Sequence, residues 1–220
     1  MKVLKFGGTS VGSAERMHAL VELINDNEPK IVVLSAMSGT TNNLVEISAA
    51  LHAEDHTKAK ELTDSLKKKY DTEIQKLYKT EKALTKGKEL IESHFNYLHS
   101  FNNNPFGINE ERAILAQGEL LSTAMFHYYL EEINVASVLL PALNFMRIDE
   151  KEDQDMAYID SAIATELAKH KGNKLFITQG YICRNAVGEI DNLKRGGSDY
   201  TATILGAAIR SEEIQIWTDI

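Results

Sequence analysis

The stretch Lys5-Phe6-Gly7-Gly8-Thr9-Ser10-Val11-Gly12-Ser13 joins a short apolar run, Val3 to Phe6, to a helical pattern from Ser13 to Asn25. Paired glycines after a strand allow a tight turn and let a phosphate approach the backbone closely. Backbone N–H groups exposed at such a strand-to-helix junction can bind an anion. An ordinary tight turn between a strand and a helix would be enough to explain the paired glycines. Lys5 favours phosphate binding, because it stands at the carboxyl end of the strand, where open α/β sheets bind ligands.

The turn lacks the spacing of two common phosphate-binding motifs. In a Walker A loop the lysine follows the glycines, whereas Lys5 precedes Gly7 and Gly8. The spacing also differs from GxGxxG, which disfavours Rossmann-type dinucleotide binding. A different phosphate-binding fold is therefore expected.

Short apolar runs rich in β-branched residues recur along the chain and are typical of parallel strands covered on both faces. Helical patterns lie between most of them, so we expect an α/β fold, a three-layer sandwich with a mostly parallel central sheet. The expected strands are Val3 to Phe6, Ile31 to Ser35, Ala136 to Leu140, Leu175 to Thr178 and Ile214 to Trp217, and the expected helices include Ser13 to Asn25, Asp160 to Lys169 and Tyr200 to Arg210.

The segment from Asp55 to Leu98 is dense in Lys and Glu, and its apolar residues recur every three or four positions, which predicts one long amphipathic helix. Asn102-Asn103-Asn104-Pro105 breaks this pattern, and a second helix is expected from about Asn109 to Leu130. We expect residues 55–130 to form a charged helical insertion. The insertion would belong to one domain, residues 1–220, that is truncated at its C-terminal end.

Composition excludes several classes of protein. With 220 residues and 43% hydrophobic content, the chain can bury the core of one large domain. Its net charge of −8 argues against nonspecific nucleic-acid binding, and Lys67-Lys68-Lys69 has acidic neighbours that predict a solvated helix face without chemistry. The N-terminal apolar run is too short for a signal peptide or membrane span. With only Cys183 and scattered histidines, we expect a cytoplasmic protein without a metal site of its own.

Two further segments carry candidate binding groups. Ser35-Ala36-Met37-Ser38-Gly39-Thr40-Thr41-Asn42 opens a helix, and helix capping explains any one of its polar residues as well as ligand binding does. Gly118 interrupts a good helical pattern at a cost of ~1 kcal/mol relative to alanine, which indicates close approach by another group. Glu119 beside it can receive an ammonium group through charge-assisted hydrogen bonds, or form a surface salt bridge.

A third glycine turn, Arg195-Gly196-Gly197-Ser198-Asp199-Tyr200-Thr201-Ala202, precedes an apolar helical pattern. The planar guanidinium of Arg195 suits a carboxylate bidentately. Ser198 is predicted to be the N-cap, so that its hydroxyl group or the amides after it can bind substrate or phosphate. Asp199 falls in the first turn of this helix.

Residues 5–11 and 195–202 closely resemble signatures of the aspartate kinases within the amino acid kinase family. The loop at 35–42 and the pair Gly118-Glu119 are similar to family segments as well. Two shorter matches, Thr178-Gln179-Gly180-Tyr181 and Trp217-Thr218-Asp219, extend the resemblance over the whole chain. Lys194 departs from the pattern, because a glycine is common there, and it leaves the geometry of that loop open.

This resemblance implies a phosphotransferase that moves the γ-phosphoryl group of ATP, bound with Mg²⁺, to the side-chain carboxylate of L-aspartate. The product, 4-phospho-L-aspartate, would feed lysine, threonine and methionine synthesis, and the protein would be a homo-oligomer. Lys5 and Asp199 would be catalytic, with the carboxylate orienting the ammonium group. The implied nucleotide-binding residues are Lys5, Phe6, Gly7, Gly8, Ser10, Gly39, Thr218 and Asp219, and the implied substrate-binding residues are Thr41, Glu119, Arg195, Gly196 and Ser198.

Three alternatives stay open. Another enzyme of the same fold would phosphorylate glutamate, acetylglutamate, carbamate or UMP. A catalytically silent module would bind aspartate without producing ADP. A structural protein built around residues 55–98 ranks last, because it explains none of the glycine turns.

Overall fold

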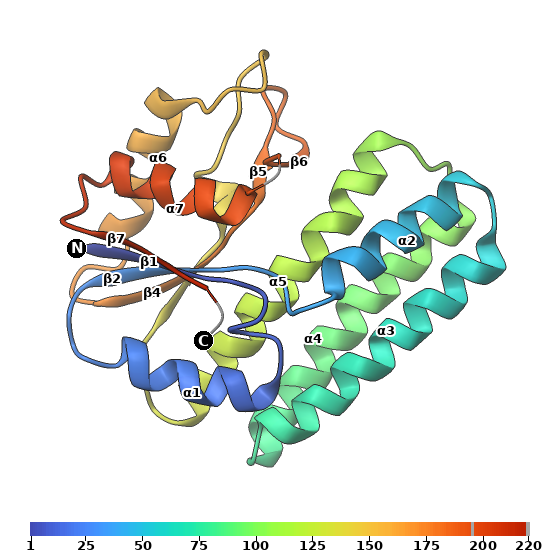
Figure 1. Cartoon of the computed structure of the whole chain (residues 1–220), viewed down its shortest axis with the longest axis horizontal. Coiled ribbons are helices and arrows are strands. Elements are labelled where there is room, and N and C mark those ends of the chain that lie inside the picture. Colours follow the sequence, from blue (N-terminus) through green and yellow to red (C-terminus); the bar gives the residue numbers. More distant parts are fainter. Residues whose placement is uncertain (195, 219–220) are drawn as a thin grey trace.

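The computed structural model describes residues 1–194 and 196–218. Within these residues a five-stranded parallel sheet has the order β3-β4-β2-β1-β7. Helices cover both faces of the sheet, which confirms the predicted α/β fold (Figure 1). The strands are β1 (Lys2–Phe6), β2 (Lys30–Leu34), β3 (Val138–Leu140), β4 (Leu175–Gln179) and β7 (Ile214–Trp217).

Alternating side chains of β1 enter two different cores, because successive residues of a strand point to opposite faces. Val3 belongs to the core beneath α6 (Met156–Ala168) and α7 (Gly197–Ala208). Leu4 and Phe6 belong to the core that α1 (Ala14–Ile24) covers. Lys5 has the same parity as Val3, so its side chain lies on the face of the sheet that carries α7.

Four helices follow one another between β2 and β3 and extend to one side of the sheet (Figure 1). They are α2 (Thr40–His52), α3 (His56–Leu77), α4 (Glu81–Ser100) and α5 (Ile108–Glu132), with a short 3₁₀ helix, η1 (Phe101–Asn103), before α5. The helix predicted from about Asn109 to Leu130 is confirmed as α5. No helix among the described residues has both the length and the apolar character to cross a membrane.

The single long helix predicted from Asp55 to Leu98 is wrong, because the chain reverses between α3 and α4. Tyr78 is extended and ends α3, and the Thr80 hydroxyl caps α4 by accepting from Ala83 N at 3.3 Å. Glu132 Oε1 fixes the turn by accepting from the backbone N–H of Thr80 at 2.6 Å. The reversal folds the apolar stripes of the two helices onto each other.

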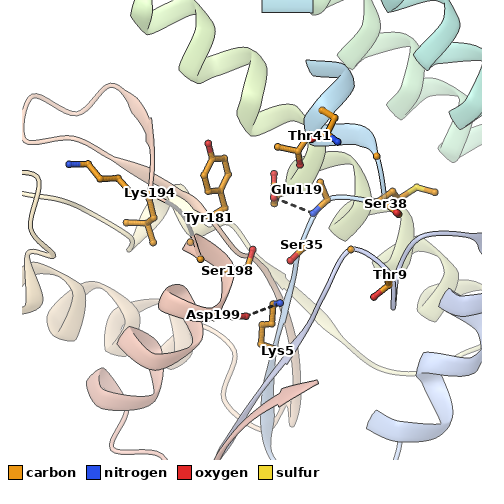
Figure 2. Close-up of a pocket in the computed structure, with 18 residues that line it drawn as sticks. Lys5, Thr9, Ser35, Ser38, Thr41, Glu119, Tyr181, Lys194, Ser198 and Asp199 are labelled. Atoms are coloured by element: carbon orange, nitrogen blue, oxygen red, sulfur yellow. Dashed lines mark hydrogen bonds and ion pairs between the residues drawn. The ribbon is translucent and has the colours of Figure 1, made fainter. Parts of the chain in front are cut away.

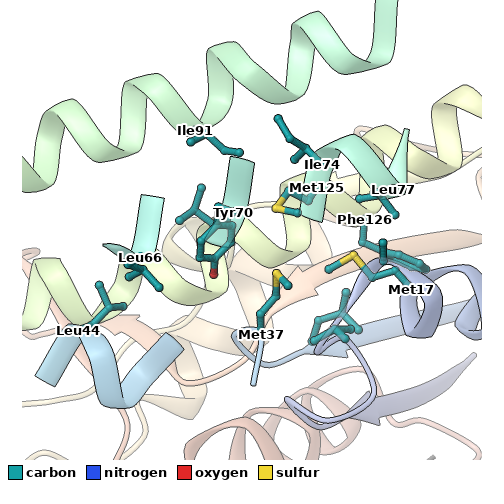
Figure 3. Packing of buried hydrophobic residues seen from close by; sticks show 14 of the residues in the cluster. Met17, Met37, Leu44, Leu66, Tyr70, Ile74, Leu77, Ile91, Met125 and Phe126 are labelled. Carbon is teal, nitrogen blue, oxygen red and sulfur yellow. The ribbon is translucent and has the colours of Figure 1, made fainter. Parts of the chain in front are cut away.

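This helical packing forms one continuous core with the sheet (Figure 3). This core contains Tyr70 and Ile74 of α3, Ile91 of α4, and Met125 and Phe126 of α5. All five residues are fully buried. The charged helices are thus bound to the sheet domain through a shared apolar interior.

Three small elements after β3 were not predicted. β5 (Ile182–Arg184) and β6 (Ile190–Asn192) form an antiparallel hairpin between β4 and α7, and η2 (Ala142–Asn144) follows β3. Helix α6 starts four residues earlier than expected, because Asp155 caps it by accepting from Tyr158 N at 3.2 Å. The hairpin leads the chain from the end of β4 to the turn before α7.

Candidate functional site

The turns after β1 and β2, together with the start of α7, line a cavity of about 620 Å³ (Figure 2). The strands are parallel, so their carboxyl ends share one edge of the sheet, the usual location of ligand sites in open α/β sheets. Most of the predicted site residues line this cavity: Lys5, Gly8, Gly39, Thr41, Glu119, Gly196, Ser198 and Asp199.

Lys5 and Asp199 form an ion pair in the cavity wall, with Nζ and Oδ1 2.8 Å apart (Figure 2). The parity of β1 points Lys5 toward α7, and Asp199 stands in the first turn of that helix. The contact is the one expected from the sequence, and the catalytic roles stay a prediction. A Cβ atom at Gly7 would lie 3.5 Å from Lys5 Nζ, so the ammonium group lies directly beside the glycine turn.

The first two turns interlock. A Cβ atom at Gly8 would lie only 2.9 Å from the carbonyl oxygen of Ala36, so the close approach requires glycine. Ser38 N also donates to Gly8 O at 3.0 Å. The two turns therefore line the cavity as directly contacting neighbours.

The N-terminus of α1 is not free for an anion. Glu73 Oε2 already accepts from Ala14 N at 2.9 Å, and Ser13 Oγ accepts from Arg16 N at 3.4 Å. A carboxylate at a helix N-terminus takes the position that a phosphate would use. Phosphate binding on this side of the cavity would therefore fall to the glycine turn itself.

Glu119 of α5 is a buried acidic residue that lines the cavity. Its side chain is buried, Oε1 accepts from Ala36 N at 3.2 Å, and Oε2 has no partner among the described residues. Burial raises the pKa of Glu119 to about 8. A Cβ atom at Gly118 would lie 2.7 Å from Ala36 Cβ, which is the close approach that the sequence predicted. The arrangement leaves one carboxyl oxygen ready for a donor.

Helix α7, which carries the Lys5 partner Asp199, begins at two glycines, Gly196 and Gly197. Gly196 is the N-cap of α7 with φ 79°, and a Cβ atom at Gly197 would lie 2.6 Å from Tyr181 Cδ2. The prediction of Ser198 as the N-cap is therefore wrong, because the left-handed glycine ends the preceding turn two residues earlier. Ser198 lies in the first helical turn, where backbone N–H groups have no acceptor inside the helix.

Four predicted residues do not line the cavity. Phe6 is fully buried and stacks on Trp217 with ring centroids 5.7 Å apart. Ser10 is buried behind the glycine turn, and its Oγ has no hydrogen-bond partner among the described residues. Gly7 supports the turn beside Lys5, and Thr218 is exposed after β7. Arg195 and Asp219 lie outside the described residues.

The cavity also has lining residues that were not assigned a role from the sequence. They are Thr9, Ser35, Ala36, Met37, Ser38, Asn42, Tyr181, Leu193, Lys194 and Gly197. Most lie within the three turns, so adjacency to a glycine was the only available signal. The side chain of Lys194 extends away from Glu119 (Figure 2) and pairs with Glu152 at 2.5 Å, so a lysine is accommodated at this position of the loop.

The described residues contain no group of three or more acidic, His or Cys side chains that could hold a metal ion. A site that supplies lysine, hydroxyl groups and backbone amides suits an anionic ligand. It fits Mg²⁺ only as a companion of phosphate oxygens and water, which is the usual coordination of this ion.

Comparison with known proteins agrees with this geometry. The family model described as "Amino acid kinase family" matches residues 1–220. Lysine-sensitive aspartokinase 3 of Escherichia coli is 29% identical over 99% of this chain and 49% of its own length. An aspartokinase of Chlamydia trachomatis is 30% identical over 99% of the chain and 48% of its own length. Chloroplastic aspartokinase 1 of Arabidopsis thaliana is 32% identical over 99% and 40%.

Solved structures show the same fold. E. coli aspartokinase III in complex with lysine and aspartate superimposes with a TM-score of 0.87 at 28% identity, over 100% of this chain and 49% of that chain. Its complex with aspartate and ADP gives a TM-score of 0.84 at the same identity and coverage. The chain spans about half the length of these relatives. The resemblance to aspartate kinases is confirmed, and the chain belongs to the amino acid kinase family.

Proposed function

We propose that this chain is the catalytic part of an aspartate kinase. It would transfer the γ-phosphoryl group of ATP to the side-chain carboxylate of L-aspartate and give 4-phospho-L-aspartate. The observation that carries this proposal is the buried carboxyl group of Glu119, which lines the same cavity as the Lys5–Asp199 pair and has one oxygen, Oε2, without a hydrogen-bond partner among the described residues. The similarity to lysine-sensitive aspartokinase 3 of E. coli, and the aspartate and ADP bound to E. coli aspartokinase III, support it.

The acceptor would bind on the α5 side of the cavity. An α-ammonium group suits Glu119 Oε2, because it provides the missing donor and the positive charge that a buried carboxylate requires. Thr41 lines the cavity near this carboxyl group and offers a hydroxyl group to the substrate (Figure 2). Arg195 would hold a substrate carboxylate, and this role rests on the sequence resemblance.

The donor would bind between the glycine turn and α7. Lys5 would neutralise charge on the phosphates, with Asp199 fixing its ammonium group, and the amides of Gly7, Gly8 and the first turn of α7 would bind phosphate oxygens. Phosphoryl transfer needs mainly this positioning and neutralisation. Mg²⁺ bound to ATP would add positive charge at the β- and γ-phosphates.

The reaction needs no general base. The side-chain carboxyl of aspartate has a reference pKa of about 3.9, so it is ionised near neutral pH. Its oxygen would attack the γ-phosphorus while the bond to the bridging oxygen breaks and ADP leaves. The protein's task is to hold the carboxylate in line with that bond.

We also propose that the protein works as a cytoplasmic homo-oligomer in the synthesis of lysine, threonine and methionine.

The test is ADP release from Mg²⁺-ATP by the protein that carries this chain, on adding L-aspartate, L-glutamate or UMP separately. We expect turnover with aspartate alone and a loss of roughly a hundredfold or more in Lys5→Met, as for other groups that stabilise charge in a transition state. Turnover with another acceptor only would contradict the roles of Glu119 and Arg195. Aspartate binding without ADP release would favour a silent binding module.

A further inference from the structure

Helix α3 reaches the cavity wall through one lysine. Lys69 Nζ donates to the carbonyl oxygen of Ser38 at 2.6 Å, across the gap between α3 and the turn after β2. The same Nζ lies 3.7 Å from the position that a Cβ atom would take at Gly39, whose φ is 78°. Lys69 therefore holds the peptide that enters the left-handed residue of this turn.

Ser38 is the point at which the two turns join. Its carbonyl accepts from Lys69, and its N–H donates to Gly8 O at 3.0 Å. A Cβ atom at Gly12 would lie 3.1 Å from Ser38 Cβ, so the first turn also packs against this side chain. A shift of Ser38 would therefore change how the turn after β1 (residues 7–13) and the turn after β2 (residues 35–42) are placed relative to each other.

Two neighbours of Lys69 on α3 hold the same region. Tyr70 OH lies 2.9 Å from Thr40 Oγ1, and both groups are buried. Glu73 accepts from Ala14 N at the start of α1. The face of α3 that includes these three residues thus contacts the flanks of both turns.

The three consecutive lysines of α3, Lys67 to Lys69, differ in what they contact. Lys67 pairs with Asp71 and Glu92, each at 3.3 Å. Lys68 is exposed. In the described part of the chain, Lys69 has no carboxylate within ion-pair distance, and its ammonium group is directed to the turn instead. Lys68 is therefore a matched control for the charge of Lys69.

We infer that Lys69 is a positioning residue of the active site. By holding Ser38, it keeps the turn after β1 (residues 7–13) and the turn after β2 (residues 35–42) in the alignment that in-line transfer requires. Lys69 is not among the residues that line the cavity, so it acts through the turn and not on a substrate. The catalytic part of this inference rests on the proposed function. Its structural part does not.

The experiment compares Lys69→Met, Lys69→Arg and Lys68→Met in the protein that carries this chain. Methionine keeps the unbranched stem and a high helix propensity, so the helix should persist. We expect faster amide hydrogen exchange in peptides covering residues 7–13 and 36–42 in Lys69→Met alone. We also expect its kcat to fall about tenfold with little change in either KM, because misplacement affects the transition state more than ground-state binding. Lys69→Arg should restore both readouts.

Each failure has a distinct signature. Exchange in Lys69→Met equal to that in Lys68→Met would overturn the inference, and so would faster exchange with unchanged kcat. An equal loss in Lys68→Met would show that bulk charge is responsible and would overturn it as well. If the unmodified protein turns over no aspartate, the proposed function fails. The exchange comparison then decides by itself whether Lys69 positions the turns.

Discussion

Glu119 combines two properties that seldom occur together on an acidic side chain. It is buried, and only one of its two oxygens has a hydrogen bond among the described residues. Desolvation disfavours the charged form, so the pKa of Glu119 rises to about 8 and the group is largely protonated at neutral pH. A cationic ligand at Oε2 would reverse this preference.

Binding of L-aspartate should therefore release a proton near pH 7. The ligand's ammonium group favours the carboxylate form of Glu119, so affinity should rise with pH up to about 8 and then level off. Calorimetry in buffers of different ionisation enthalpy measures the released proton. Succinate, which lacks the ammonium group, is the matched control and should release none. Aspartate binding at pH 7 without proton release would contradict the assignment of Glu119.

The same group should make stability depend on pH. The folded pKa is raised from 4.5 to about 8, so the folded state binds more protons than the unfolded state between these values. The contribution of Glu119 is fully present below pH 4.5 and is lost as pH rises through about 8. The free energy of unfolding of the unmodified chain, relative to Glu119→Gln, should fall over this range in urea titrations. A constant difference would show that the carboxyl group is ionised throughout.

At the scale of elements, the reversal between α3 and α4 shows what sequence patterns cannot predict. The apolar period is the same in α3 and α4, and Tyr78-Lys79-Thr80 contains neither Gly nor Pro. Thr80 is of a type favoured at helix N-caps, but one threonine in a helical pattern does not signal a reversal. The deciding contacts are tertiary. Glu132, more than fifty positions later, caps the turn, and Gly87 lets Tyr78 fold back onto α4. Helix existence and type were predictable here, whereas the break between the two helices was not.

Gly87→Ala should destabilise the protein although alanine favours helices. Its Cβ atom would lie 2.5 Å from Cε2 of Tyr78, a buried side chain whose hydroxyl donates to Met125 O at 2.9 Å and cannot shift freely. Overpacking of this kind costs about 1–3 kcal/mol. Urea unfolding measures the change. Lys88→Ala, at an exposed neighbouring position, should stay within about 0.5 kcal/mol of the unmodified chain. Equal stability of the two variants would show that the ring relaxes without cost.

At the scale of the whole molecule, strand runs separated by helical patterns were enough to predict the layered α/β fold. The glycine turns were enough to predict which edge of the sheet carries the cavity. Residues such as Ser38 and Tyr181 could not be predicted, because their place in the cavity depends on how distant turns pack together. The start of α7 was misjudged for a related reason. A left-handed glycine, and not the favoured capping residue, begins that helix.

The strand order also places the first strand of the chain, β1, between β2 and β7. During synthesis the glycine turn and Lys5 are made long before Asp199 and β7, the second neighbour of β1. Non-local pairings of this kind are slow to form and leave strand edges exposed in the meantime. The Lys5–Asp199 ion pair is therefore also a late folding contact, so Lys5 would stay without Asp199 until nearly all of residues 1–220 have left the ribosome.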